Sequence, residues 1–121
     1  MTTETKSRQI EPDISVIEIS GRLGLGNTLL SIEAAIRKLI DNGVRKIIVD
    51  IAGLNYIDSA GIGMLVSCHG HMGHQGGRLR IAGAQGLVRE SFDIVHIGLI
   101  VPLDPDAIVA AAHFSADGAS A

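Results

Sequence analysis

The short and nearly continuous apolar run Lys46–Ile51 constrains the fold of this chain more than any other segment. Runs of this kind form central strands whose two faces are both covered. Other apolar segments repeat at strand or helix spacing along the chain. Strands are predicted at Ile14–Ser20, Lys46–Ile51, Arg78–Ala82 and Leu99–Leu103, and helices between Asn27 and Gly43, over Gly61–His74, over 87–95 and over Ile108–Phe114.

This alternation predicts one α/β domain, in which about four helices cover a mixed or parallel sheet of about four to five strands. Asn27 is the expected N-cap of the first helix. Asp104 is the expected N-cap of the last helix, with Pro105 at its first position. The domain is expected to span residues 1–121 with its core at about 8–114, residues 1–9 forming a loose lead-in and residues 115–121 a frayed, disordered tail.

Composition excludes several classes of function. The chain has 121 residues, of which 46% are hydrophobic, enough for one compact core. Its net charge of −3 and 2% aromatic content disfavour nucleic-acid binding, which needs basic surface and stacking side chains. The single cysteine, Cys68, rules out an internal disulfide. With no apolar signal core in Met1–Gln9 and no membrane-spanning run, we expect a soluble cytoplasmic domain.

Enzyme and cofactor motifs are incomplete. Ser59 follows a strand and begins a helix, as a nucleophilic serine can, but the tight nucleophile elbow needs glycine where Ile57 stands. The loop Gly21–Asn27 resembles a dinucleotide loop, yet Leu29 occupies the place of its third glycine. No phosphate-binding Gly-Lys-Ser/Thr sequence is present. We therefore expect no catalytic residue and no cofactor.

One cluster has the composition of a metal site. Cys68, His69, His71 and His74 lie on the predicted second helix, and three of them could share a face. However, Cys68 also falls on the apolar face, and no fourth ligand is evident. A solvated histidine face is the favoured interpretation, and no metal is expected.

The junction before the second helix is the main candidate site. Ser59 stands where backbone amides are unpaired and the helix dipole is positive, so it could cap the helix, bind an anion or carry a phosphate. Gly61 and Gly63 leave this helix start thinly covered, which would let another protein approach closely. Apolar surface beside it is expected from Ile62, Met64 and Leu65.

The same residues resemble a known family. Val49–Ile51, a short spacer and Tyr56–Leu65 are similar to the signature of STAS domains, specifically those of bacterial anti-sigma-factor antagonists. Ile19–Leu23 resembles the family's second-strand ending, and Gly76–Ile81 its helix-to-strand turn. The order of strands and helices agrees from about residue 8 to residue 114.

The resemblance implies a binding switch without catalysis. In that family the matching serine, here Ser59, is phosphorylated by an ATP-dependent anti-sigma factor that is also a serine protein kinase. The unphosphorylated domain binds this kinase and releases its sigma factor; a phosphatase reverses the modification. Asp58 is expected to cap the helix and orient the Ser59 hydroxyl. The protein would be a monomer or weak homodimer in transcription regulation or stress response, with these partner-binding residues: Leu25, Asn27, Asp58, Ser59, Ala60, Gly61, Ile62 and Met64.

One position departs from the family's pattern. Many members carry an acid after Gly-x-Leu, facing the partner, where this chain has Gly24. Two other functions stay open. The domain could be an accessory module of a transporter or a signalling scaffold without a phospho-switch, or a nucleotide binder that uses the Gly24–Asn27 loop and the Ser59 helix end.

Overall fold

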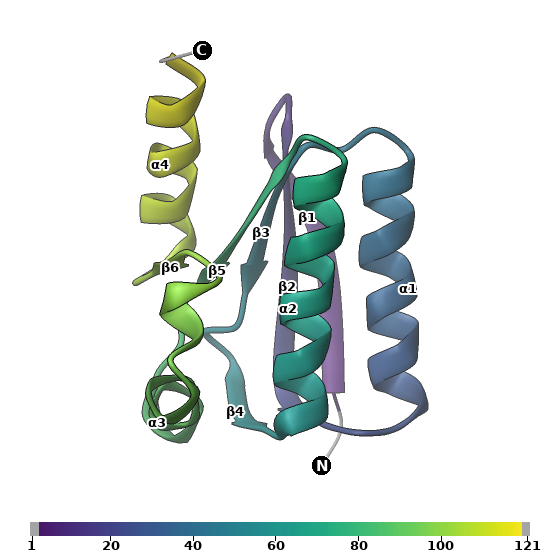
Figure 1. Cartoon of the computed structure of the whole chain (residues 1–121), viewed down its shortest axis with the longest axis vertical. Coiled ribbons are helices and arrows are strands. Elements are labelled where there is room, and N and C mark those ends of the chain that lie inside the picture. Colours follow the sequence, from purple (N-terminus) through teal and green to yellow (C-terminus); the bar gives the residue numbers. More distant parts are fainter. Residues whose placement is uncertain (1–2, 120–121) are drawn as a thin grey trace.

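The computed structural model describes residues 3–119 and shows a six-stranded mixed sheet with helices on both faces (Figure 1). The strand order is β1-β2-β3-β5-β6, and β4 pairs with β2 off this path. Among the strand pairs within residues 3–119, only β1–β2 is antiparallel. The strands are β1 Thr3–Glu11, β2 Ile14–Leu23, β3 Lys46–Asp50, β4 Leu54–Ile57, β5 Arg78–Ala82 and β6 Leu103–Asp104.

In the described part of the chain, four α-helices cover the sheet: α1 Asn27–Asp41, α2 Ser59–His74, α3 Gly86–Val95 and α4 Ala107–Ala119. A 3₁₀ helix, η1 Ile97–Leu99, follows α3. The α/β class and the mixed sheet confirm the prediction from the sequence, although the sheet has six strands rather than four to five.

The central strand β3 is buried on both faces, as its apolar run predicts. Ile47 and Val49 belong to the large core beneath α1, α2 and α3. Ile48 points to the opposite face, where Ala110 and Phe114 of α4 cover it. Figure 1 shows α1 and α2 side by side on one side of the sheet and α4 on the other.

The helix α1 follows its predicted apolar stripe. Leu29, Ile32, Ile36 and Ile40 are buried. The helix ends just before Gly43, whose φ of 99° is left-handed. The predicted N-cap is off by one residue. Gly26 holds that position, Asn27 is the first helical residue, and no side chain caps the helix.

Two strands were not predicted. The expected lead-in at residues 1–9 is strand β1 from Thr3 onward, paired along its length with β2; residues 1–2 lie outside the described residues. The second, β4, is only four residues long. In addition, β2 does not end at Gly21 but continues through it, with a φ of 84°, to Leu23.

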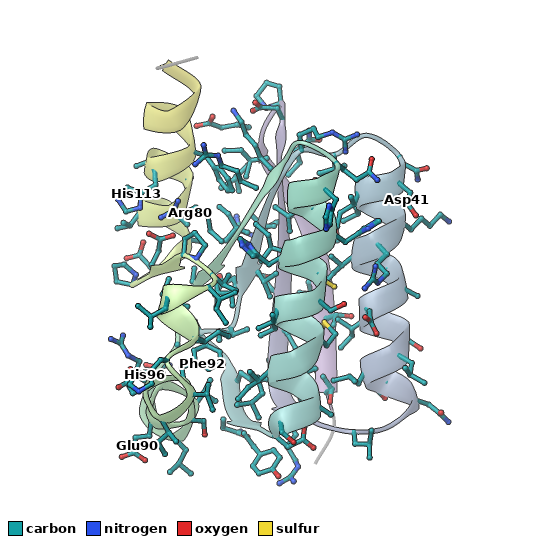
Figure 2. The ribbon with its side chains drawn as sticks, in the orientation of Figure 1. Asp41, Arg80, Glu90, Phe92, His96 and His113 are labelled. Carbon is teal, nitrogen blue, oxygen red and sulfur yellow. The ribbon has the colours of Figure 1, made fainter. Side chains whose placement is uncertain are left out.

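The C-terminal segment differs most from the prediction. Leu99–Leu103 is not a strand, because only Leu103–Asp104 pairs with β5. Asp104 is not the cap of the last helix. Its carboxylate is buried and accepts from Arg80 Nε at 2.6 Å, with His113 Nδ1 2.5 Å away. Figure 2 shows Arg80 close to His113 of α4. Asp106 Oδ1 caps the helix instead, by accepting from Val109 N at 2.8 Å.

The predicted tail, residues 115–121, is helical as far as Ala119, because α4 continues past Phe114. Residues 120–121 lie outside the described residues. Phe114 itself is fully buried against the sheet, which explains why the helix docks where it does.

Candidate functional site

The candidate site lies at one end of the sheet, where β2 and β4 finish and α1 and α2 begin (Figure 1). Leu23 and Ile57, the last residues of the two parallel strands, are register partners. The backbone amide of Asp58 donates to the carbonyl of Leu23 at 3.2 Å. This pairing sets the loop after β2 against the first turn of α2.

Asp58 joins these two segments through its carboxylate. Oδ1 accepts from the backbone amide of Gly61 at 2.9 Å, which makes Asp58 the N-cap of α2 and confirms the predicted cap. Oδ2 accepts from the amide of Leu25, also at 2.9 Å, in the loop that leads to α1. The hydrogen bonds from Leu25 and then Gly61 lower the pKa of the Asp58 carboxyl below its ordinary value.

Ser59 is the first residue of α2, and it is exposed. Its hydroxyl therefore lies at the positive end of the helix dipole, accessible to an enzyme. Ala60, the next residue, is half-buried against the core. The predicted role of Asp58 in orienting the hydroxyl stays a prediction.

Gly61 has a different role from the one predicted. It is buried, and a Cβ there would lie 2.6 Å from the Leu23 carbonyl oxygen and 2.8 Å from Ile57 Cγ1. Gly61 therefore lets α2 approach the strand ends and is not open to a partner. Gly63, in contrast, is exposed, with no atom within 4 Å of a Cβ.

Two of the residues predicted as apolar surface belong to the core. Met64 is 3% exposed and Leu65 is fully buried, so neither offers contact to a partner. Ile62 is half-buried at the edge of the same core. The exposed apolar side chain of the site is instead Leu25, at 84%, and Asn27 beside it is also exposed.

Sequence reasoning placed Tyr56 near this surface but missed Arg22 and its contact with Tyr56. The two are register partners on β2 and β4, and the guanidinium carbon of Arg22 lies 3.8 Å from the centre of the Tyr56 ring. Knowledge of the β2–β4 pairing would have placed them together. They line an open hollow of about 250 Å³ with Asn27 and Asp58. The Arg22 guanidinium and the Asp58 carboxylate both line this hollow, so nucleotide binding there stays a hypothesis.

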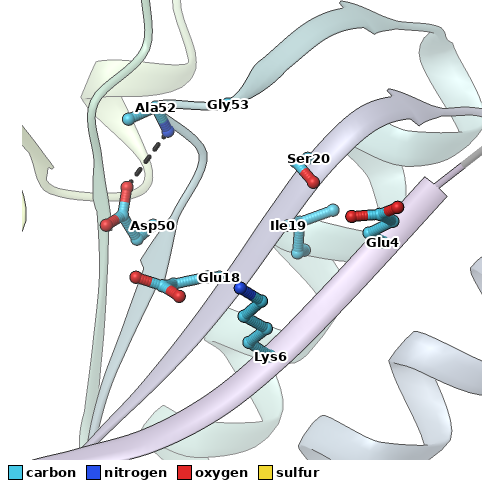
Figure 3. Close-up of a pocket in the computed structure, with 8 residues that line it drawn as sticks. All are labelled: Glu4, Lys6, Glu18, Ile19, Ser20, Asp50, Ala52 and Gly53. Carbon is cyan, nitrogen blue, oxygen red and sulfur yellow. Dashed lines mark hydrogen bonds between the residues drawn. The ribbon is translucent and has the colours of Figure 1, made fainter.

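A second hollow of about 250 Å³ lies on the sheet face beside α4, over β1, β2 and β3 (Figure 3). Glu4, Glu18 and Asp50 line it with the ammonium of Lys6. Asp50 Oδ1 accepts from the Ala52 amide at 3.0 Å and so stabilises the turn after β3. These side chains form a solvated polar face.

The side chains of Cys68, His71 and His74 do not come together as ligands of one metal ion. Cys68 is buried in the core, and burial raises the pKa of its thiol to about 11. His71 Nε2 lies 2.9 Å from Asp41 Oδ1 on α1, while His74 is exposed. Within residues 3–119, no group of three or more His, Cys, Asp or Glu side chains could hold a metal ion.

The sequence model of the STAS domain matches residues 5–107 of this chain. The chain belongs to the STAS domain family. This finding confirms the resemblance found in the Asp58–Ser59 motif. Within residues 3–119 of this STAS domain, none of the helices has the length and apolar character needed to cross a membrane.

Solved structures share the fold of this STAS domain. An anti-sigma factor antagonist from Mycobacterium paratuberculosis is similar with a TM-score of 0.80 and 18% identity, over 93% of each chain. The Bacillus anti-sigma factor antagonist SpoIIAA, in its unphosphorylated form, gives a TM-score of 0.80 and 21% identity over 93% of this chain and 97% of that chain. The murine anion transporter Slc26a9 gives 0.72 and 14%, over 94% of this chain and 22% of that chain.

Proposed function

We propose that this STAS domain is an anti-sigma-factor antagonist whose partner binding is switched off by phosphorylation of Ser59. The observation that carries the proposal is the exposed Ser59 hydroxyl at the first position of α2, next to a capping Asp58. The similarity to SpoIIAA, a protein solved in phosphorylated and unphosphorylated forms, supports it. The proposed partners are an ATP-dependent anti-sigma factor with serine kinase activity and a phosphatase, all in the cytoplasm.

The site can accept a phosphate without damage to the domain. A phosphoserine carries about −1.5 to −2 charges, and the N-terminus of a helix favours such a group. At an interface the same group must lose its water and adds negative charge beside Asp58. A coupling of about 2–3 kcal/mol would weaken partner binding roughly 30- to 150-fold. The domain then acts as substrate and binding switch, with no catalytic group of its own.

The direct test is phosphorylation in vitro. Purified protein is incubated with ATP and each candidate anti-sigma serine kinase from the same genome, and the modified residue is located by mass spectrometry. We expect one phosphate, at Ser59. The Ser59→Ala variant should take up none, while Ser31→Ala, which changes an exposed serine on α1, should be modified as wild type. Phosphate elsewhere, or none from a kinase active on another antagonist, would count against the proposal.

The switch itself is tested by binding. Ser59→Asp should weaken binding to the kinase, whereas Ser59→Ala should retain it, because only the former adds charge at the start of α2. Isothermal titration calorimetry gives both affinities. Equal binding by the two variants would refute a charge-based switch even if Ser59 is modified.

The alternative is an accessory module of a transporter or scaffold. It is supported by the likeness to Slc26a9, in which this fold accounts for 22% of a larger chain. Here Ser59 would not be a switch. Neighbouring transporter genes, and co-purification of this protein with transporter subunits rather than with a kinase, would favour the alternative.

A further inference from the structure

Gly24 makes room for the Asp58 carboxylate. A Cβ at position 24 would lie 2.8 Å from Asp58 Oδ2 and 3.3 Å from its Cγ. The first distance is shorter than side chains tolerate, so the carboxylate would have to move. Gly24 is not among the glycines with positive φ, so its backbone would accept alanine. The missing side chain therefore serves the contact with Asp58 and not a turn.

The carboxylate held in this space fixes the exposed loop residue Leu25. Asp58 Oδ2 accepts from the Leu25 amide, while Oδ1 of the same group accepts from Gly61 in the first turn of α2. The Leu25 amide and the first turn of α2, which begins at Ser59, thus bind the same carboxylate. The Leu25 side chain is 84% exposed, and its backbone amide is held by Asp58, the residue that precedes Ser59.

We propose that Leu25 is the apolar anchor of the partner interface, and that Gly24 and Asp58 are its positioning residues. The inference rests on the proposed function, because its occupant is the kinase that modifies Ser59. An enzyme that reaches the Ser59 hydroxyl must cover the start of α2, and it then meets the tethered Leu25.

The chemistry of the loop defines what that partner must offer. The residues Gly24, Leu25 and Gly26 carry no charge, and Leu25 is the large side chain among them. An apolar recess beside the kinase's phosphoacceptor position would take this leucine. A cationic side chain of the kinase that pairs with an acid at position 24 in other members would have no partner at Gly24. Burying one leucine side chain corresponds to roughly 10- to 150-fold in affinity.

The tether is tested first, without a partner. Hydrogen exchange of the Leu25 amide is measured by NMR in wild type, in Gly24→Ala and in Gly70→Ala. The last is a matched glycine in α2 where a Cβ meets nothing within 4 Å. We expect Gly24→Ala to speed exchange at Leu25 roughly 10-fold, because the displaced carboxylate no longer accepts from that amide. Unchanged exchange would overturn the positioning role of Gly24.

The anchor is tested by titration with the kinase that phosphorylates wild-type Ser59. Leu25→Ala should weaken binding roughly 10- to 150-fold, and Leu25→Met should retain most of it. Gly24→Ala should also weaken binding, but should add nothing further in a Leu25→Ala background, since it acts through Leu25. Gly70→Ala should bind as wild type.

The outcomes separate this inference from the proposed function. A kinase that phosphorylates Ser59 but binds Leu25→Ala within twofold of wild type overturns the anchor and leaves the switch intact. Additive losses in the double variant overturn the positioning role. If no kinase modifies Ser59, the proposed function fails and the anchor with it, while the exchange measurement still decides whether the tether exists.

Discussion

Two glycines of the same helix should respond to alanine with opposite signs. A Cβ at Gly61 would lie 2.6 Å from the Leu23 carbonyl oxygen and 2.8 Å from Ile57 Cγ1, while a Cβ at Gly63 meets no atom within 4 Å. The Leu23 carbonyl also accepts from the Asp58 amide at 3.2 Å. Gly61→Ala must therefore push α2 off the strand ends or break this hydrogen bond, and Gly63→Ala only adds a methyl group in solvent.

The magnitudes follow from these contacts. Gly63→Ala should raise the free energy of unfolding by about 0.5–1 kcal/mol, since glycine in a helix is that much less favourable than alanine. Gly61→Ala should lower it by about 1–3 kcal/mol through overpacking, which exceeds the gain in helix propensity. Urea titrations followed by circular dichroism measure both. With m near 2 kcal/mol/M, the midpoints of the two variants should differ by about 1–2 M.

The result that refutes this reasoning is a Gly61→Ala protein at least as stable as wild type. It would mean that α2 does not contact the ends of β2 and β4 as closely as described. A loss of stability in Gly63→Ala would show instead that the first turns of α2 contact more than the structure shows. Because both substitutions are the same chemical change two residues apart, effects on the unfolded chain cancel in the comparison.

Three further predictions concern other buried or linked groups. Asp58→Ala should lower the free energy of unfolding by about 0.5–2 kcal/mol at pH 7. Because the folded-state pKa is depressed, that difference should shrink in urea titrations below pH 4, as pH falls through the folded pKa. Asp104→Ala should cost about 3–5 kcal/mol, measured by urea titration, since the largely buried Arg80 guanidinium loses that carboxylate. Cys68, with a pKa of about 11, should not react with a disulfide reagent until urea unfolds the protein.

Periodic segments were predicted well because burial alone specifies them. The stripe from Leu29 to Ile40 and the continuous run of β3 both appear where the sequence places them. The edge strand β1 was not predicted, because its residues Thr3–Glu11 are mostly polar and exposed. Its pairing with β2 stabilises it through main-chain hydrogen bonds. The periodicity of the side chains does not indicate pairing that depends on the main chain.

The site was predicted in position but not in detail. The strand-to-helix junction identified Ser59 and the Asp58 cap, because both are local features. Met64 and Leu65 were misplaced because glycines and other small residues weaken the apolar periodicity of α2, so its pattern does not tell the buried face from the exposed one. Asp104 and Asp106 are equivalent candidates for a cap in sequence, and tertiary contact with Arg80 decides between them.

The role of Gly24 depends on a side chain 34 positions later in the chain, so no local pattern could indicate it. In the sequence, Gly24 is noticed only because many family members carry an acidic residue at this position. In the structure a side chain at that position would displace the Asp58 carboxylate, whose Oδ2 accepts from the Leu25 amide. The glycine at position 24 is thus coupled to the hydrogen bond that holds the Leu25 amide, and the two should be considered together when a partner is sought.

The electrostatics of this junction determine whether a phosphate on Ser59 would destabilise the folded domain or its complex with the partner. The amides of Leu25 and Gly61 already bind the Asp58 carboxylate at the start of α2 and lower its pKa, so these two donors stabilise that negative charge. A phosphate on Ser59 would lie at the same end of α2, where further amides of the first turn can solvate it. The folded domain would therefore tolerate the modification, and its cost would fall on the complex. There the phosphate and Asp58 would have to be desolvated together, next to an apolar contact at Leu25.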